Sequence, residues 1–272
     1  MSGTQQFAGK IAVITGGASG IGKAIARQAA ARGATVIVAD IEQAALDDAA
    51  AELGAVAIRA DVASLADMHA LADAVLARFG RVDIFFSNAG VASTGRIADM
   101  RRSDWEWLLG VNVWGAIHGI AAFLPLLRTN PAGGHIAVTA SEAGFHATPG
   151  IGGYSVTKSA VTAIFETLAL ELAEDAANIG VTILCPGPVR SRLGDSQRNR
   201  PPALAGGAMI DNDLEAMPEG GQLRWIDPDR AADMLMRAIL NRDLYAFTHP
   251  EMAPLIERRH AAIAAALRSA EA

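Results

Sequence analysis

Short apolar runs alternate along the chain with longer segments in which apolar residues recur every three or four positions. The short runs are rich in β-branched residues and apolar on both faces, which is typical of strands buried in a parallel sheet. We expect seven strands, near Ile11–Thr15, Thr35–Ala39, Val56–Ala60, Val82–Ser87, His135–Thr139, Val181–Cys185 and Leu244–Phe247. The longer segments predict helices near Ile21–Arg32, Gln43–Leu53, Leu65–Phe79, Ser103–Arg128, Tyr154–Asn178, Pro228–Asn241 and Ala253–Ser269.

This alternation predicts an α/β protein: a Rossmann-type, doubly wound parallel sheet of seven strands with helices on both faces. No repeat or linker interrupts it, so we expect residues 1–272 to form a single domain. Residues 250–272 form a C-terminal helical extension, which either covers the sheet edge or lines an interface or a pocket.

Residues 190–225 also fall outside the alternation, because they are rich in Gly, Pro and polar residues. A segment this long without regular structure is a lid, a binding loop or disorder. Its apolar residues favour a lid over a disordered loop. They are Leu193, Leu204, Met209, Ile210, Leu214, Met217, Leu223 and Trp225.

A glycine-rich turn follows the first expected strand directly and opens the first helix. It reads Thr15-Gly16-Gly17-Ala18-Ser19-Gly20-Ile21-Gly22. Glycines allow a tight turn and a close approach of the backbone to a pyrophosphate. The start of the helix offers unpaired N–H groups and a partial positive charge to the phosphates. The order strand, turn, helix therefore predicts a dinucleotide site rather than an ordinary turn. Its expected cofactor contacts are Gly16, Ser19, Gly20, Ile21 and Gly22.

Asp40 ends the second expected strand, where a carboxylate can accept hydrogen bonds from the adenosine ribose and would repel a 2′-phosphate. Neither Ser19 nor Ile41 offers a cation to neutralise that phosphate, so we expect NAD rather than NADP as the cofactor. The alternative that Asp40 only caps the next helix stays open. Asp61 and Val62, after the third strand, are expected to contact the adenine, although Asp61 could equally cap the following helix.

Tyr154 and Lys158 are four residues apart in a long apolar helical segment, which places a phenol and an ammonium on one face. A free tyrosine titrates near pH ~10, too high for a base at neutral pH, whereas a fixed positive charge beside it lowers that pKa. The spacing alone arises by chance on many helices. Together with a dinucleotide turn it indicates acid–base chemistry beside a hydride carrier.

These motifs together resemble the short-chain dehydrogenase/reductase family over nearly the whole chain. The turn has the family's Thr-Gly-x-x-x-Gly-x-Gly pattern, and Ser87-Asn88-Ala89-Gly90 is similar to its Asn-Asn-Ala-Gly segment. Ser141 lies thirteen residues before Tyr154, which is the family's spacing, although Ala140 stands where many members carry a second serine. The resemblance identifies the catalytic residues as Asn112, Ser141, Tyr154 and Lys158.

The resemblance implies that the protein interconverts a secondary alcohol and a ketone by hydride transfer between NAD and the carbinol carbon. Tyr154 would move the alcohol proton, Lys158 would lower the pKa of Tyr154 and bind the nicotinamide ribose, and Ser141 would bind the substrate oxygen. Asn112 would link Lys158 to a water-filled proton path. The segment Pro186-Gly187-Pro188-Val189 resembles the family's nicotinamide contact. The remaining expected cofactor contacts are Asn88, Ala89, Gly90, Pro186, Gly187, Val189 and Ser191.

The substrate pocket should form from the loops after the fourth, fifth and sixth strands, together with the lid. Its expected contacts are Ser141, Ala143, Phe145, His146, Tyr154, Pro188 and Leu193. No fixed charge is aimed at this region, which predicts an apolar secondary alcohol or ketone rather than a sugar or hydroxy acid. Four arginines of the lid have acidic neighbours and predict a solvated surface rather than an anion clamp. They are Arg190, Arg192, Arg198 and Arg200.

A finer resemblance concerns the substrate. The segments 186–193 and 244–249 are similar to those of Cα-dehydrogenases, which oxidise benzylic alcohols in lignin-derived β-aryl ethers. A hydroxysteroid or another small secondary alcohol stays an alternative. The competing class is a non-catalytic NAD-binding sensor or scaffold, against which the working spacing of Ser141, Tyr154 and Lys158 counts.

Composition mainly excludes other classes of protein. A net charge of −6 argues against a nucleic-acid or anionic membrane surface. Cys185 is the only cysteine, which fits a reducing cytoplasm, and no metal-ligand spacing is present. No signal peptide is evident, and the apolar stretch Gly115–Leu127 is too short to span a bilayer. We expect a cytoplasmic enzyme that, by the family resemblance, pairs through the helices Ser103–Arg128 and Tyr154–Asn178 as a homodimer or homotetramer.

Overall fold

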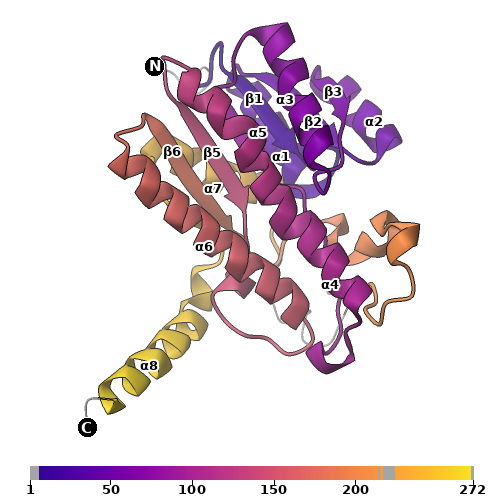
Figure 1. The fold of residues 1–272 in the computed structure, drawn as a ribbon, viewed down its shortest axis with the longest axis vertical. Coiled ribbons are helices and arrows are strands. Elements are labelled where there is room, and N and C mark those ends of the chain that lie inside the picture. The colour runs from indigo at the N-terminus through magenta and orange to yellow at the C-terminus, as the bar shows by residue number, and fades with distance from the viewer. Residues whose placement is uncertain (1–5, 214, 217–223, 271–272) are drawn as a thin grey trace.

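The computed structural model describes residues 6–213, 215–216 and 224–270 (Figure 1). Seven strands form one sheet in the order β3-β2-β1-β4-β5-β6-β7, and every paired neighbour is parallel. The strands are β1 (Ile11–Thr15), β2 (Thr35–Asp40), β3 (Val56–Arg59), β4 (Ile84–Ser87), β5 (Gly134–Thr139), β6 (Ile179–Cys185) and β7 (Tyr245–Phe247). The order reverses between β1 and β4, where a doubly wound sheet opens its binding crevice. The predicted fold class is confirmed.

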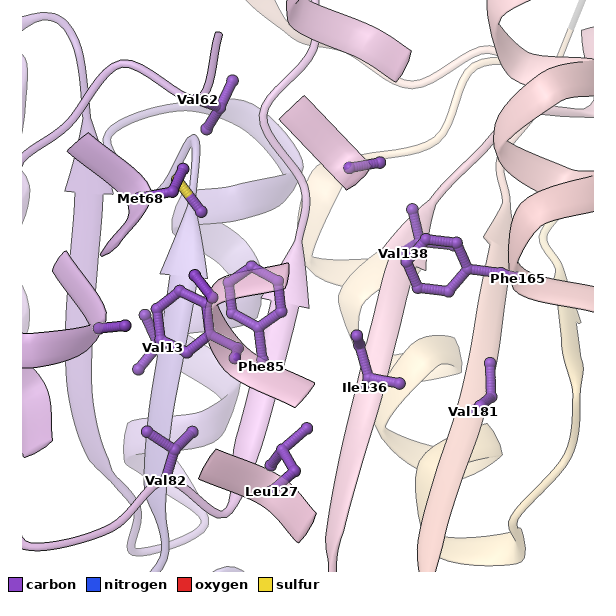
Figure 2. Packing of buried hydrophobic residues seen from close by; sticks show 14 of the residues in the cluster. Val13, Val62, Met68, Val82, Phe85, Leu127, Ile136, Val138, Phe165 and Val181 are labelled. Carbon is purple, nitrogen blue, oxygen red and sulfur yellow. The ribbon is translucent and has the colours of Figure 1, made fainter. Parts of the chain in front are cut away.

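Helices cover both faces of the sheet, because successive strand residues point to opposite sides. Val13 and Phe85 belong to one core cluster, which also contains Met68 and Leu127 from the helices above it (Figure 2). The helices on this face are α3 (Leu65–Phe79), α5 (Gly115–Thr129) and α6 (Gly152–Glu174). Ile14, next to Val13, belongs to the second cluster. The helices of that face are α1 (Gly20–Ala31), α2 (Gln43–Leu53) and α7 (Pro228–Asn241).

Several elements begin and end where the sequence predicts, namely β1, α2, α3, α7 and the last helix α8 (Ala253–Ser269). Helix α6 ends at Glu174, earlier than the predicted Asn178, because Ala176 adopts a left-handed conformation with φ of 51°. The N–H of Ala177 then bonds back to the carbonyl of Leu172, which closes the helix.

The predicted helix Ser103–Arg128 is a continuous run of three pieces. These are α4 (Arg102–Leu109), a π-helical turn η2 (Gly110–Trp114) and α5. The run Arg102–Thr129 is long and apolar enough to cross a membrane by length and composition, and 44% of its most apolar window is buried inside the protein. Its exposed part includes Trp114 of η2, and α6 exposes Val156 and Leu170.

The described part of residues 190–225 is folded onto the body of the protein. It contains the 3-10 segments η4 (Arg192–Asn199) and η5 (Pro202–Leu204), and Ile210 pairs with Thr94 in an isolated bridge. Met209 is buried against Trp107 and Leu108, so these residues form a packed segment rather than a disordered loop. Three of the apolar residues predicted for the lid, Leu214, Met217 and Leu223, lie outside the described residues.

Helix α8 confirms the predicted C-terminal helix. It projects away from the sheet, and it has no buried residue (Figure 1). Only its first turns approach the body, where Ile256, Arg259 and His260 line a groove with residues of α6 and β7. The helix therefore leaves the sheet edge largely uncovered.

Candidate active site

The glycine turn brings the start of α1 against the carboxyl end of the sheet. A Cβ on Gly22 would lie 2.0 Å from the carbonyl oxygen of Gly16, and one on Gly16 would lie 2.8 Å from Cα of Ala89. Gly16 and Gly20 also have positive φ values of 64° and 50°, which other residues adopt at a cost. The turn therefore requires glycine for close backbone packing, and the cradle that results fits the pyrophosphate of a dinucleotide.

One cleft runs along the carboxyl end of the sheet, from the glycine turn to Tyr154. Every residue that the sequence predicts as a cofactor contact lines it. They are Gly16, Ser19, Gly20, Ile21, Gly22, Asp40, Ile41, Asp61, Val62, Asn88, Ala89, Gly90, Tyr154, Lys158, Pro186, Gly187, Val189 and Ser191. Parallel strands end at the same edge of a sheet, so residues that follow different strands meet here.

Asp40 connects the end of β2 to the glycine turn. Its Oδ2 accepts a hydrogen bond from the N–H of Ala18 at 3.1 Å, and its Oδ1 accepts one from Glu42 at 3.1 Å. Burial raises the pKa of Asp40, and these backbone hydrogen bonds oppose that shift. The cap position of α2 is Glu42, so the alternative that Asp40 caps this helix is not supported.

Asp61 does not cap the following helix α3 either. Its carboxylate accepts a hydrogen bond from the N–H of Ala63 at 2.9 Å. The side chain that caps α3 is Ser64, which accepts from the N–H of Asp67 at 3.2 Å. Asp61 is thus left on the wall of the cleft beside Val62.

Asn88 ties three central strands together beneath the cleft. Its amide nitrogen donates to the carbonyl of Thr15 at 3.0 Å, and its side-chain oxygen accepts from Thr139 at 2.9 Å. The hydroxyl of Thr15 accepts the N–H groups of Asn88 and Ala89. These bonds join the ends of β1, β4 and β5 beneath the cleft.

Asn112 and Lys158 converge near Gly90. Asn112 lies in the π-helical turn η2, and such turns are frequent at functional sites because they redirect a side chain within a helix. A Cβ on Gly90 would lie 3.4 Å from Oδ1 of Asn112 and 3.5 Å from Nζ of Lys158. The Asn112 amide exchanges two hydrogen bonds with Val91 and donates to Thr157 of α6 at 2.9 Å. These contacts fix Asn112 against the helix that carries Lys158.

Tyr154, Lys158 and Ser141 meet at the far end of the cleft. Nζ of Lys158 donates to the carbonyl of Thr139 at 2.7 Å and lies 5.6 Å from the centre of the Tyr154 ring. Ser141 bonds the carbonyl of Pro186 at 3.3 Å. The predicted helical spacing therefore brings a phenol, an ammonium and a hydroxyl together.

The pKa of Tyr154 differs from the sequence expectation. Burial raises it to about 12, and the hydrogen bond with Ser141 only opposes that rise. Burial also lowers the pKa of Lys158 to about 8. The raised pKa of Tyr154 is therefore opposite in direction to the lowering that the sequence predicts.

Glu142, next to Ser141, is a buried acid that the sequence did not single out. Its Oε2 has no hydrogen-bond partner among the described residues, and burial raises the pKa of this carboxyl to about 7. A Cβ on Gly187 would lie 2.9 Å from this oxygen and 2.6 Å from Nδ1 of His249. Glu142 therefore lies behind the segment expected to contact the nicotinamide.

The raised pKa of Glu142 predicts a loss of stability as pH rises. Between its ordinary pKa of 4.5 and the folded value of about 7, the folded protein holds a proton that the unfolded chain has released. The free energy of unfolding should therefore fall across this range by about 3 kcal/mol relative to Glu142→Gln. Urea unfolding at pH 5 and pH 8 measures this difference, with exposed Glu171→Gln of α6 as control. Equal differences between wild type and Glu142→Gln at both pH values would contradict the prediction.

The predicted substrate contacts are only partly brought together. Of the residues that the structure describes, Ser141, Tyr154 and Leu193 line the cleft, whereas Ala143, Phe145, His146 and Pro188 do not. Phe145 instead packs against Phe247, with ring centres 5.2 Å apart, and lines the groove beside α8. The segment after β5 forms the 3-10 turn η3 (Glu142–Gly144), which the sequence pattern does not reveal.

Several cleft residues are not among the cofactor and substrate contacts that the sequence predicts. The wall opposite β5 comes from α4, η2 and the lid segment. These residues include Glu42, Glu106, Trp107, Val111, Arg192, Ser196, Arg198, Asn199, Pro201 and Leu204. The apolar residues of 190–225 were the only sequence signal for this wall.

The lid arginines also require a correction. Arg200 is not on a solvated surface: its side chain is 7% exposed and it pairs with fully buried Asp104 at 2.7 Å. It also lies over the ring of Trp107 at 5.2 Å. Arg198 is not on a solvated surface either, since its side chain is 21% exposed and pairs with Glu42. Arg190 and Arg192 are half exposed, as the sequence predicts for a solvated lid surface.

The family model and the similar sequences indicate the same protein family. A family model described as short chain dehydrogenase matches residues 10–201. The C alpha-dehydrogenase of Sphingobium sp. (strain NBRC 103272 / SYK-6) is 31% identical over 270 residues, which cover 95% of this chain and 87% of that protein. The CLA biosynthesis dehydrogenase/reductase of Lactiplantibacillus plantarum is 31% identical over 268 residues, covering 94% and 93% of the two chains.

Solved structures agree with these relatives. A short-chain dehydrogenase/reductase from Burkholderia phymatum, in complex with NAD, superposes with a TM-score of 0.89 at 36% identity and covers 95% of each chain. The family match spans the glycine turn, Ser141, Tyr154 and Lys158. The chain belongs to the short-chain dehydrogenase/reductase family and is an oxidoreductase.

Proposed function

We propose that this oxidoreductase uses NAD to interconvert an apolar secondary alcohol and its ketone. The observation that carries the proposal is the cleft itself, which begins at the glycine turn and ends where Tyr154, Lys158 and Ser141 meet. NAD bound along such a cleft supplies the hydride acceptor. The remaining chemistry is the movement of one proton, for which the end of the cleft offers a phenol.

The residues at this end have distinct roles in the proposal. Tyr154 takes the proton of the alcohol, or returns it in the reverse direction, and Ser141 donates a hydrogen bond to the same substrate oxygen. Lys158, held by the carbonyl of Thr139, keeps a positive charge beside Tyr154. Asn112 positions Lys158 through the contact between η2 and α6. A competing role as a non-catalytic NAD sensor would not require this arrangement.

The preference for NAD over NADP rests on Asp40. Its carboxylate is turned into the cleft and already accepts two backbone N–H groups, so a 2′-phosphate placed there would meet a negative charge. The cofactor-binding residues Asp61 and Val62 extend the same pocket toward the adenine. These contacts support NAD as the physiological cofactor.

Replacement of Asp40 by alanine should therefore raise the ratio of kcat/KM for NADP to that for NAD by about tenfold or more. The reason is that the repelling carboxylate is lost while the glycine turn is kept. Steady-state rates with both cofactors measure the ratio. Asp47→Ala, an exposed acid on α2, is the control and should leave it unchanged. A ratio that Asp40→Ala does not move would refute the role of this carboxylate.

The substrate class follows from the walls of the cleft beyond Tyr154. Leu193, Leu204 and Trp107 supply apolar surface there. Identity of 31% with a C alpha-dehydrogenase supports a benzylic alcohol of a lignin-derived aryl ether as the substrate. A hydroxysteroid or another small secondary alcohol is the alternative.

The proposal is tested by turnover of an alcohol panel. NADH formation should be measured with benzylic aryl-ether alcohols, hydroxysteroids, simple aryl alcohols, a sugar and a 2-hydroxy acid. We expect turnover of the apolar secondary alcohols and no turnover of the sugar or the 2-hydroxy acid. Binding of NAD without turnover of any alcohol or ketone would instead favour the non-catalytic class.

We also propose a homodimer or homotetramer built on the α5–α6 face. Exposed Trp114 ends η2 just before α5, exposed Val156 and Leu170 lie on α6, and a partner would remove these side chains from water. Burial in such an interface would also explain why the run Arg102–Thr129 is so apolar in a protein that we expect in the cytoplasm.

A further inference from the structure

The lid segment reaches across the cleft to the adenosine side of the cofactor site. Glu42, two residues beyond Asp40, accepts hydrogen bonds from Nε and Nη2 of Arg198 at 3.1 and 2.8 Å. The side-chain amide of Asn199 donates to the same carboxylate at 2.9 Å. All three residues line the cleft, so this contact is made at its mouth rather than on a remote surface.

Two guanidinium groups face Glu42. Nη1 of Arg192 lies 3.7 Å from its second oxygen, and Arg198 makes the closer ion pair. Burial raises the pKa of Glu42, but the hydrogen bonds from Arg198 and Asn199 outweigh it and hold the pKa below its usual value. Asp195 is the other acid here, since it pairs with Arg192 at 2.8 Å and with Arg198 at 3.6 Å. Acids and arginines therefore balance within this cluster.

The cluster changes the account of cofactor choice. Ser19 and Ile41 offer no cation to a 2′-phosphate, but Arg192 and Arg198 bring two from the lid into the same cleft. In dinucleotide sites an arginine near the end of the second strand is what accommodates this phosphate. Asp40 alone is then an incomplete barrier, because a nearby guanidinium could offset its charge.

We propose that Glu42 is a specificity-determining residue that excludes NADP by occupying Arg198 and Arg192 and by adding a second carboxylate beside Asp40. This inference rests on the proposed preference for NAD. The repulsive element costs NAD nothing, because its 2′-hydroxyl carries no charge. An approaching 2′-phosphate must break the Glu42–Arg198 contact and leave the Glu42 carboxylate without its partner.

A simple fastening of the lid is the competing explanation of the same contacts. If Glu42 only held the lid closed, its loss would weaken NADH and NADPH alike. If Glu42 determines specificity, its loss must favour NADPH selectively, because Arg198 loses its closest acid and becomes available to a phosphate, whereas Arg192 keeps its pair with Asp195. The two explanations therefore differ in the ratio of the two affinities.

The test is equilibrium binding of NADH and NADPH, followed by nucleotide fluorescence, to wild type and Glu42→Gln. Glutamine keeps an oxygen acceptor for Arg198 and Asn199 but removes the charge. We expect the ratio of Kd for NADPH to Kd for NADH to fall about tenfold, with Kd for NADH changed less than about threefold. Glu52→Gln, an exposed acid of α2 paired with Lys23 and Arg27, is the matched control and should not move the ratio.

A second variant tests whether Arg198 is the group that binds the 2′-phosphate. Adding Arg198→Gln to Glu42→Gln should cancel most of the gain for NADPH, because a cation that binds the phosphate is then missing. A ratio unchanged within about twofold in Glu42→Gln, or a gain that persists without Arg198, would overturn the inference. Wild-type protein that binds NADPH as tightly as NADH would instead refute the proposed preference for NAD.

Discussion

Replacement of Tyr154 by phenylalanine should lower kcat/KM for the alcohol by about 10³-fold or more, within the range of general acid–base catalysis. The ring remains, so its packing near Lys158 is preserved, and the only lost group is the hydroxyl that moves the proton. Binding of NADH should change less than about threefold, because the glycine turn and Asp40 are untouched. Steady-state rates and nucleotide fluorescence measure the two quantities separately.

The chain offers a matched control for this variant in its second tyrosine. Tyr245 lies on β7, lines the groove beside α8 and hydrogen-bonds Glu166. Tyr245→Phe removes the same atom outside the cleft and should keep wild-type turnover within about twofold. If Tyr154→Phe retained a tenth or more of the wild-type kcat/KM, Tyr154 would not be the proton donor and acceptor.

Replacement of Asp104 by alanine should destabilise the protein by about 3–5 kcal/mol, because it leaves the buried guanidinium of Arg200 without a counter-ion. Asp104 is fully buried and also accepts the N–H groups of Arg101 and Ala208, so it joins α4 to the lid segment. The free energy of unfolding in urea measures this loss. We also expect a raised KM for the alcohol, since the lid wall of the cleft depends on the same contact.

A neighbouring ion pair provides the control for Asp104. Glu106 pairs with Arg102 on the exposed side of the same helix, where solvent screens the interaction. Glu106→Gln should therefore change the free energy of unfolding by less than about 1 kcal/mol. A similarly small loss for Asp104→Ala would show that the Arg200 pair does not hold the lid segment.

The helices, the strands and the cofactor contacts could be predicted because short stretches of the sequence indicate each of them. Helix α3, for instance, runs from a serine cap at Ser64 to a left-handed glycine at Gly80, and both ends are visible in the sequence. Most of the cofactor contacts lie in segments that follow a strand, and parallel strands end at one edge, while Tyr154 and Lys158 come from α6. Local patterns therefore led to residues that are distant in the chain but lie together in the cleft.

The remaining features depend on contacts between segments with no shared local pattern. Arg200 meets Asp104 and Arg198 meets Glu42 across 96 and 156 positions of the chain. Without these distant partners in view, the charged residues of the lid are predicted to face solvent. The predicted lowering of the pKa of Tyr154 was wrong for a related reason, since burial raises this pKa and burial is a property of the whole fold.

The most direct test of the proposed reaction is to follow the hydrogen that leaves the carbinol carbon. The best alcohol of the panel, deuterated at that carbon, should be turned over with NAD and the NADH analysed by mass spectrometry. Hydride transfer predicts one deuterium in each NADH formed and none in the released proton. NADH without deuterium, or no NADH from any secondary alcohol of the panel, would contradict the proposed function.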